Sequence, residues 1–220
     1  MPTLKPTLTS FKERYKTDTT RITIRDRDFS FFVPESLDSF IDQEDLFHNF
    51  PLWTKIWEAS IILADYLAGL EVEPEKIFLE IGCGLGLVGI VASSFGHRVT
   101  MTEYNQDALS FASANALLNN LTGLEIKELD WNRPQVKGTF DYIVGSEITY
   151  KENNFQPLLK LFKTFLRDDG EIILANGIRK TSMELIRRMS DMFHIKGQKK
   201  NLRSQDREIS IILCKMMFKG

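Results

Sequence analysis

The sequence predicts an α/β fold built on a doubly wound, mostly parallel sheet. From Trp57 onward, strand and helix patterns alternate, as is typical of a parallel sheet flanked by helices. An apolar run over 76–81 passes directly into a glycine-rich turn and then into helical spacing, as a strand-to-helix junction does. Residues 153–167 carry apolar side chains at helical spacing with lysines between them. One face of that helix is therefore expected to pack on the sheet.

Each element follows from a local pattern. A helix over 57–70 precedes the first strand of the sheet, at 76–81. The next elements are expected in this order: helix 86–95, strand 97–103, helix 105–119, strand 124–129, strand 139–146, helix 153–167 and strand 170–176. Beyond Arg179 we expect a helix over 181–193 and two strands, 194–200 and 207–215, whose polar connection is typical of a terminal hairpin.

The first 50 residues have a different pattern. Two β-rich runs, 21–25 and 29–33, flank the polar residues 26–28 and end at Pro34, which predicts a hairpin. The acidic stretch 38–45 predicts a short helix. The apolar residues expected to anchor this part onto the main body are Phe47, Phe50, Leu52 and Trp53. We therefore divide the chain into an N-terminal cap segment, 1–50, and a main domain, 51–220.

Composition limits the class of protein. The chain has 220 residues, 43% of them hydrophobic, and a formal net charge of -2, so no overall field attracts nucleic acid or an anionic membrane. Cys83 and Cys214 belong to no CxxC or His/Cys cluster, which predicts reduced thiols and no metal. No apolar stretch approaches the roughly 20 residues of a membrane span, and residues 1–6 lack a signal-peptide core. We expect a cytoplasmic protein.

A second strand makes the glycine turn specific. Residues 98–103 form a strand that ends at Glu103, and an acid about twenty residues after such a turn is typical of a ribose-binding site. Gly82, Gly84 and Gly86 would let a ligand approach the main chain. Dinucleotide dehydrogenases use G-x-G-x-x-G, whereas this turn is E-x-G-x-G-x-G. It resembles the first motif of class I S-adenosylmethionine-dependent methyltransferases.

Further blocks narrow the resemblance to methyltransferase family 16, the small seven-strand protein-lysine methyltransferases. The blocks occur at matching intervals: Trp57-Glu58-Ala59-Ser60; Glu80-Ile81-Gly82-Cys83-Gly84-Leu85-Gly86-Leu87-Val88-Gly89; Thr102-Glu103-Tyr104-Asn105; Leu129-Asp130-Trp131; and Gly145-Ser146-Glu147-Ile148-Thr149-Tyr150. Arg179 fits the same pattern. The resemblance covers roughly residues 50–180 and leaves the N-terminal segment outside it.

The resemblance implies a Rossmann-like, seven-stranded sheet of order 3-2-1-4-5-7-6 with strand 7 antiparallel. S-adenosylmethionine would lie across the carboxyl ends of strands 1, 2 and 4, as the general rule for open α/β sheets expects. Two positions depart from the family, which usually has Asp where this chain has Glu103 and Glu147. The longer side chain of Glu103 still reaches a ribose diol. At Glu147 the extra methylene alters the reach toward a substrate.

The cofactor site is predicted from these blocks. Its members are Trp57, Glu80, Gly82, Gly84, Gly86, Glu103, Tyr104, Asp130, Trp131 and Ser146. Asp130 would accept the adenine amino proton, and Trp131 would either pack on the base or belong to the core. Glu80 would either attract the positive end of the cofactor or cap the next loop. Trp57 would be either a wall of the pocket or part of the apolar face of its helix.

Glu147 and Tyr150 are the predicted catalytic residues, at the end of strand 4 where the methyl group would point. The alternative for them is a helix-leading acid and a packed aromatic ring. Methyl transfer to nitrogen is a direct displacement that needs no covalent intermediate and no metal, and a protein lysine is the expected acceptor. Glu147 would position the acceptor, because a carboxylate raises the pKa of a neighbouring ammonium. Arg179 is either a family residue or a surface cation.

Other functions stay open to different degrees. Methylation of a nucleic-acid base is disfavoured, because the segment after strand 4 lacks an Asn/Asp-Pro-Pro-aromatic motif. A small-molecule acceptor remains open, since the cap segment could close over a compact substrate. A non-catalytic S-adenosylmethionine-binding protein also remains open, although Glu147 and Tyr150 argue against it.

Overall fold

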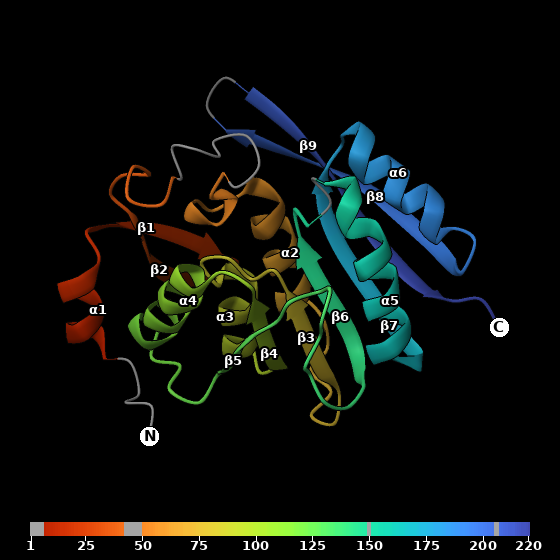
Figure 1. The fold of residues 1–220 in the computed structure, drawn as a ribbon, viewed down its shortest axis with the longest axis horizontal. Coiled ribbons are helices and arrows are strands. Elements are labelled where there is room, and N and C mark those ends of the chain that lie inside the picture. Colours follow the sequence, from red (N-terminus) through yellow and green to blue (C-terminus); the bar gives the residue numbers. More distant parts are fainter. Residues whose placement is uncertain (1–6, 42–49, 149–150, 205–206) are drawn as a thin grey trace.

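The computed structural model describes residues 7–41, 50–148, 151–204 and 207–220, and it contains a seven-stranded sheet with helices on both faces (Figure 1). The strands of this sheet are β3 (Ile77–Ile81), β4 (Arg98–Glu103), β5 (Glu125–Glu128), β6 (Phe140–Ser146), β7 (Leu166–Gly177), β8 (Phe193–Ser204) and β9 (Arg207–Phe218). They lie in the order β5-β4-β3-β6-β7-β9-β8, and β9 is antiparallel to both of its neighbours. Counted from β3 as the first strand, this is the order 3-2-1-4-5-7-6. The predicted α/β fold class is confirmed.

Apolar cores lie on both faces of the sheet. On one face α2 (Glu58–Ala68), α3 (Leu87–Ser94) and α4 (Gln106–Leu118) bury side chains such as Leu63 and Ile90. On the other face η2 (Glu152–Asn154) leads into α5 (Phe155–Phe165), and α5 and α6 (Lys180–Met189) bury side chains such as Phe162 and Leu185. Figure 1 shows α3 and α4 on one side of the strands and α5 and α6 on the other.

Several boundaries differ from the predicted ones: α6 ends at Met189 and not at residue 193, β8 extends to Ser204, and the end of α5 also moves. α5 ends at Phe165 and β7 begins at Leu166, whereas the apolar spacing predicted a helix through residue 167 and a strand from residue 170. Leu166 has φ -80° and ψ 135°, is buried, and pairs with Phe140 on β6. Packing of Leu166 against the neighbouring strand therefore ends the helix before its sequence period ends.

The N-terminal segment contains a helix and a hairpin. α1 (Leu8–Arg14) precedes β1 (Thr17–Ile24) and β2 (Arg27–Pro34), which pair antiparallel, so the predicted hairpin is confirmed. The turn is shorter than the predicted 26–28, because Arg25 takes a left-handed φ of 56° and lets the pairing continue to Ile24 and Arg27. Residues 38–40 form a turn, and the rest of the predicted short helix falls outside the described residues.

An aromatic cluster attaches this segment to α4. The ring of Phe111 lies 4.9 Å from that of Phe11 and 5.4 Å from that of Trp53, which belongs to η1 (Leu52–Thr54). Trp53 is thus an anchor, as predicted. Phe50 is 47% exposed, so its prediction as an anchor was wrong, and Phe47 lies outside the described residues.

Asn115 on α4 and Asn119, which caps the end of α4, give the main chain of β2 the hydrogen-bond partners that a neighbouring strand would supply. Asn119 accepts a hydrogen bond from the Ser30 amide at 3.0 Å and donates to the Ser30 carbonyl at 2.7 Å. The buried Asn115 does the same with Phe32, at 2.7 Å and 3.2 Å, and also donates to the Leu85 carbonyl at 2.9 Å. Because Leu85 belongs to the glycine turn, one side chain connects the hairpin to that turn.

Candidate functional site

The glycine turn, residues 82–86, follows β3 at the edge of the sheet where the parallel strands end. The predicted glycines all have left-handed torsions, with φ of 68° at Gly82, 53° at Gly84 and 89° at Gly86. Residues with a side chain rarely adopt such torsions, so the turn requires glycine at these positions. Gly86 is also the residue from which α3 begins, and the first amides of α3 therefore lie at this edge.

Glu103 ends β4, and its carboxylate binds the main chain of the turn. Oε2 accepts a hydrogen bond from the Gly84 amide at 3.1 Å. Oε1 accepts from the amides of Tyr104 and Asn105, at 2.8 Å and 3.1 Å. A carboxylate has room for further donors. The strand-end acid and the glycine turn are therefore in direct contact, while the role of Glu103 toward a ribose stays a prediction.

Trp131 lies against the glycine turn. A Cβ atom on Gly82 would stand 3.5 Å from Cζ2 of Trp131 and 3.2 Å from Cγ2 of Ile148. The half-buried indole of Trp131 therefore packs beside bare main chain at the end of β3. Trp131 also packs against the apolar core on this side of the sheet, so its predicted packing on the adenine base stays a prediction.

Asp130 is held in the loop after β5. The Leu129 amide donates to the Glu103 carbonyl at 2.9 Å, which fixes the start of this loop beside β4. Oδ1 of Asp130 accepts from the Asn132 amide at 2.8 Å and from the Asn132 side chain at 3.1 Å. Oδ1 of Asp130 therefore stabilises a local turn. The predicted contact of Asp130 with adenine would be made by Oδ2.

Glu80 is a buried acid beneath the turn. It is 1% exposed, and its Oε2 has no hydrogen-bond partner among the described residues. Burial raises the pKa of Glu80 to about 8, and a hydrogen bond from the Gly89 amide opposes this rise. A Cβ atom on Gly89 would stand 2.5 Å from Oε2, so glycine leaves room for the carboxyl group. Because Oε2 is itself buried, the role of Glu80 toward the cofactor stays a prediction.

Glu80→Gln is expected to flatten the pH dependence of stability of the cofactor-free protein. The carboxyl group keeps its proton up to about pH 8 in the folded state and only to about pH 4.3 in the unfolded chain. The unfolded state therefore binds fewer protons, and the wild-type free energy of unfolding falls by up to about 1.4 kcal/mol per unit between about pH 5 and pH 8. Urea denaturation across this range measures the slope. Parallel curves for the two proteins would show that Glu80 is already ionised in the fold.

A second buried acid lies at the opposite edge of the sheet. Asp141 is 3% exposed and accepts hydrogen bonds from the Ile77 amide at 2.9 Å and from Arg167 at 2.7 Å, with Lys76 3.2 Å away. Burial alone would raise the pKa of Asp141, but these donors together hold it below its ordinary value. Asp141 is thus a fully partnered carboxylate that fixes strand ends, in contrast to Glu80.

Glu147 follows β6 in a strained conformation. Its φ is 53°, which is costly for a residue with a side chain and is characteristic of sites where position matters. Oε1 accepts from the Gly177 amide at 2.8 Å, and Oε2 forms an ion pair with Arg179 at 2.8 Å. The side chain of Glu147 is 13% exposed. The end of β7 therefore fixes the carboxylate, and Arg179, left undecided by the sequence, is its partner.

Of the remaining predicted residues, Ser146 and Tyr104 are described by the structure and lie at this edge. Ser146 is the last residue of β6 and pairs with Ala175. Tyr104 donates its amide to Glu103, but its side chain is 64% exposed. Tyr150 lies outside the described residues, so its role stays a prediction.

Trp57 is engaged within its own segment. Its indole N–H donates to the Leu52 carbonyl at 2.7 Å, and the Lys55 ammonium lies 3.9 Å from the ring centroid. These contacts close the turn before α2 and favour a structural role, so the pocket-wall role of Trp57 is left as a prediction.

Two neighbours of the turn were missed by the sequence analysis. The Trp53 carbonyl would stand 3.6 Å from a Cβ atom on Gly84, and Ile148 covers Gly82 from the other side. The sequence pattern around Trp53 and Ile148 does not indicate these contacts, because they form only when segments that are distant in the chain pack together.

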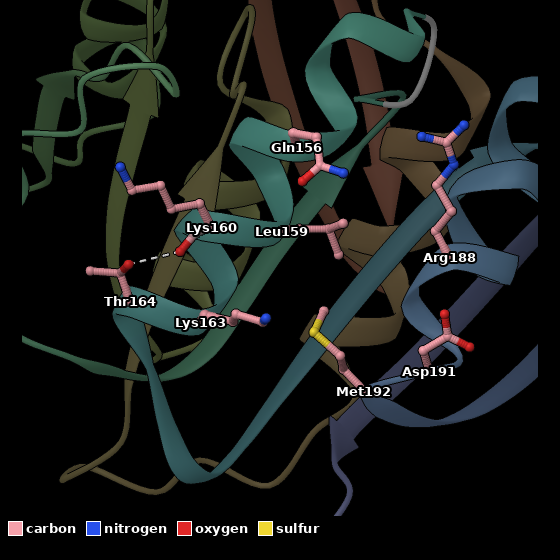
Figure 2. A pocket seen from close by; sticks show the side chains of 8 residues that line it. All are labelled: Gln156, Leu159, Lys160, Lys163, Thr164, Arg188, Asp191 and Met192. Atoms are coloured by element: carbon pink, nitrogen blue, oxygen red, sulfur yellow. Dashed lines mark hydrogen bonds between the residues drawn. The ribbon is translucent and has the colours of Figure 1, made fainter.

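Two hollows lie away from this edge. A groove of about 630 Å³ separates α5 from α6 (Figure 2), and a hollow of about 160 Å³ is lined by residues including Phe78 and Tyr142. Neither contains a predicted site residue. In the described part of the chain, His, Cys, Asp and Glu side chains form no group of three that could hold a metal ion. No described helix has the length and apolarity needed to span a bilayer.

The sheet order, the glycine turn and the strand-end acid define the class I methyltransferase fold. A family model described as lysine methyltransferase matches residues 44–192, and the chain belongs to this family. Protein N-lysine methyltransferase METTL21A of Danio rerio is 34% identical over 134 residues, which are 56% of this chain and 60% of that protein. The histidine protein methyltransferase 1 homolog of Dictyostelium discoideum is 31% identical over 129 residues, 56% of this chain and 42% of that protein. The chain thus matches less than two thirds of either relative.

A solved structure has the same fold. The ribosomal protein L11 methylase from Lactobacillus delbrueckii subsp. bulgaricus superposes with a TM-score of 0.63 at 18% identity, covering 91% of this chain and 99% of that chain. At this identity the likeness supports the fold alone.

Proposed function

We propose that this protein transfers a methyl group from S-adenosylmethionine to the side-chain nitrogen of a protein lysine. The observation that carries the proposal is the placement of acids at the ends of three adjacent strands, β4, β3 and β6. Glu103 contacts the glycine turn, Glu80 is buried in β3 just before the turn, and Glu147 follows the neighbouring strand. Membership of the lysine methyltransferase family supports the same activity.

The residues at the turn fit S-adenosylmethionine chemically. Bare main chain at the left-handed glycines allows a ligand to approach closely, and Glu103 places a carboxylate beside them. We assign Glu103 to the ribose hydroxyls and Trp131 to the adenine ring. The bound cofactor supplies an electrophilic methyl group on a sulfonium, and alignment of the acceptor accounts for much of the rate.

We propose that Glu147 and Arg179 position the acceptor lysine. Converting a lysine of pKa about 10.4 to its neutral form at pH 7 costs roughly 4–5 kcal/mol. An isolated carboxylate would increase this cost, because it stabilises the ammonium. The ion pair with Arg179, at 2.8 Å, weakens that effect and leaves Glu147 able to accept a hydrogen bond from the acceptor. We therefore propose Glu147 as a positioning carboxylate.

Labelled S-adenosylmethionine tests the proposal directly. Purified protein is incubated with fractionated cell extract, and label is expected in protein and, after acid hydrolysis, in methyl-lysine. Label in RNA, in small molecules or nowhere would contradict the proposed reaction. Label in methyl-histidine would retain a protein acceptor and reject lysine.

We also propose that residues 51–220 carry the activity and that residues 1–50 form a cap, in a cytoplasmic protein. The contacts of Phe11 and Phe32 with the cluster around Phe111 support a cap that is attached to the main domain. The proposed location rests on the sequence alone.

A further inference from the structure

We propose that the groove between α5 and α6 binds an acidic, aliphatic segment of the protein substrate. The inference rests on the proposed protein acceptor and adds a docking surface to it. The groove has a volume of about 630 Å³ and is lined by residues of both helices and of the turn that follows α6 (Figure 2). None of these residues belongs to the predicted cofactor or catalytic site.

The floor of the groove is aliphatic. Leu159 on α5 and Met192 after α6 are half-buried and pack against the core beneath the sheet. Figure 2 shows Leu159 and Lys163 projecting from α5 toward Met192. An aliphatic side chain of a bound segment can therefore contact the floor while an acidic side chain meets the Lys163 ammonium.

The charges of the groove favour an anionic partner. Lys160, Lys163 and Arg188 line it, against one carboxylate, Asp191. Lys160 and Lys163 are exposed and form no ion pair with any other described residue. Arg188 bonds Glu184 through Nε at 2.7 Å, which leaves the rest of its guanidinium fork for another acceptor. The groove therefore carries uncompensated positive charge.

The same asymmetry extends over the C-terminal third of the chain. Residues 153–220 contain fourteen Lys and Arg but seven Asp and Glu, although the whole chain has a net charge of -2. An acidic peptide and an RNA strand would both respond to this field. The groove lining contains no aromatic side chain on which bases could stack, and its floor is aliphatic. These features favour a peptide.

The groove lies along α5, a helix that begins at the edge of the sheet where the acceptor site is proposed. α5 follows the strand end that carries Glu147, and α6 begins directly after Arg179, so both helices start at the same edge of the sheet. α5 has 11 residues and is about 16 Å long. A segment held along it keeps the rest of the substrate near that edge, which raises the effective concentration of an acceptor lysine.

Fluorescence anisotropy with labelled eleven-residue peptides tests this assignment. One peptide combines glutamate and leucine, and the other has glutamine in place of every glutamate. We expect the glutamate peptide to bind at least tenfold more tightly, and Lys160→Glu/Lys163→Glu to weaken its binding at least tenfold. Lys137→Glu/Lys196→Glu makes the same charge change at exposed positions outside the groove and should alter affinity less than twofold. Circular dichroism verifies that both double variants fold.

Several outcomes would overturn the assignment. They are equal binding by the two double variants, no binding of the glutamate peptide, or tighter binding of a single-stranded RNA that responds to the same variants. If proteins of the extract are methylated but the glutamate peptide does not bind, the docking role of the groove is rejected and the proposed function is retained. Groove-dependent peptide binding without label in any protein would reject the proposed function, and with it the view that the bound segment belongs to a substrate.

Discussion

Glu147→Gln is expected to lower the rate of methyl transfer by about a hundredfold, because small misplacements of a reacting group cost about that much. Glutamine keeps an oxygen for the Gly177 amide but loses the charge that pairs with Arg179 at 2.8 Å. Arg179 would then stand unpaired beside the acceptor and repel a lysine ammonium. Single-turnover transfer from labelled S-adenosylmethionine measures the rate. Calorimetry should show a cofactor affinity within about threefold of wild type, since the side chain of Glu147 bonds Gly177 and Arg179 and, among the described residues, forms no hydrogen bond or ion pair with the glycine turn.

Glu152→Gln provides the matched control for this variant. It makes the same chemical change at an exposed residue of η2, five positions along the chain. Its rate should equal that of the wild type. A wild-type rate for Glu147→Gln as well would remove Glu147 from the acceptor site.

Glu103→Ala is expected to weaken S-adenosylmethionine binding at least tenfold. Charge-assisted hydrogen bonds to the ribose hydroxyls would contribute about 1.5–3 kcal/mol, which corresponds to roughly ten- to hundredfold in affinity. Alanine also removes the acceptor of the Gly84 amide, at 3.1 Å, and with it one bond that shapes the turn. Isothermal titration calorimetry measures the change.

Glu128→Ala is the control for this second variant. Glu128 lies directly opposite Glu103 in the register of β4 and β5, is exposed, and bonds the side chain of Gln106. Its loss should leave cofactor affinity unchanged. Thermal melting of both variants separates a binding effect from unfolding, and an unaltered affinity in Glu103→Ala would refute the ribose assignment.

The parts of the site that the sequence predicted are those that local chain chemistry determines. The glycine turn could be placed because Gly82, Gly84 and Gly86 follow an apolar strand without interruption, and glycine is the residue that most readily adopts the left-handed torsions found there. Glu103 could be placed because it ends the next strand at a spacing that the fold fixes. The alternation of strand and helix patterns likewise predicted a parallel sheet flanked by helices, whereas the order of its strands was implied by the resemblance to the family.

The parts that escaped prediction depend on how distant elements meet. Arg179 remained undecided between site and surface because its ion pair joins the ends of β6 and β7, 32 positions apart in the chain. The end of α5 was misplaced because burial of Leu166 against β6 has no helical signature. Phe50 is apolar, yet the fold leaves it 47% exposed. Periodicity gives the direction of a side chain within its element and says nothing about its neighbours across space.

The carboxamide of Asn115 ties the amino-terminal hairpin to the loop between β3 and α3. Deleting β2 would take away its partners at Phe32, at 2.7 Å and 3.2 Å, and leave only the Leu85 carbonyl, at 2.9 Å. A buried amide group without a hydrogen-bond partner destabilises the fold. The Asn115 side chain would therefore reorient, or water would enter next to Leu85. A shortened version of this protein should therefore keep the hairpin, because its removal would disturb the glycine turn directly, whereas the central strands do not depend on Asn115.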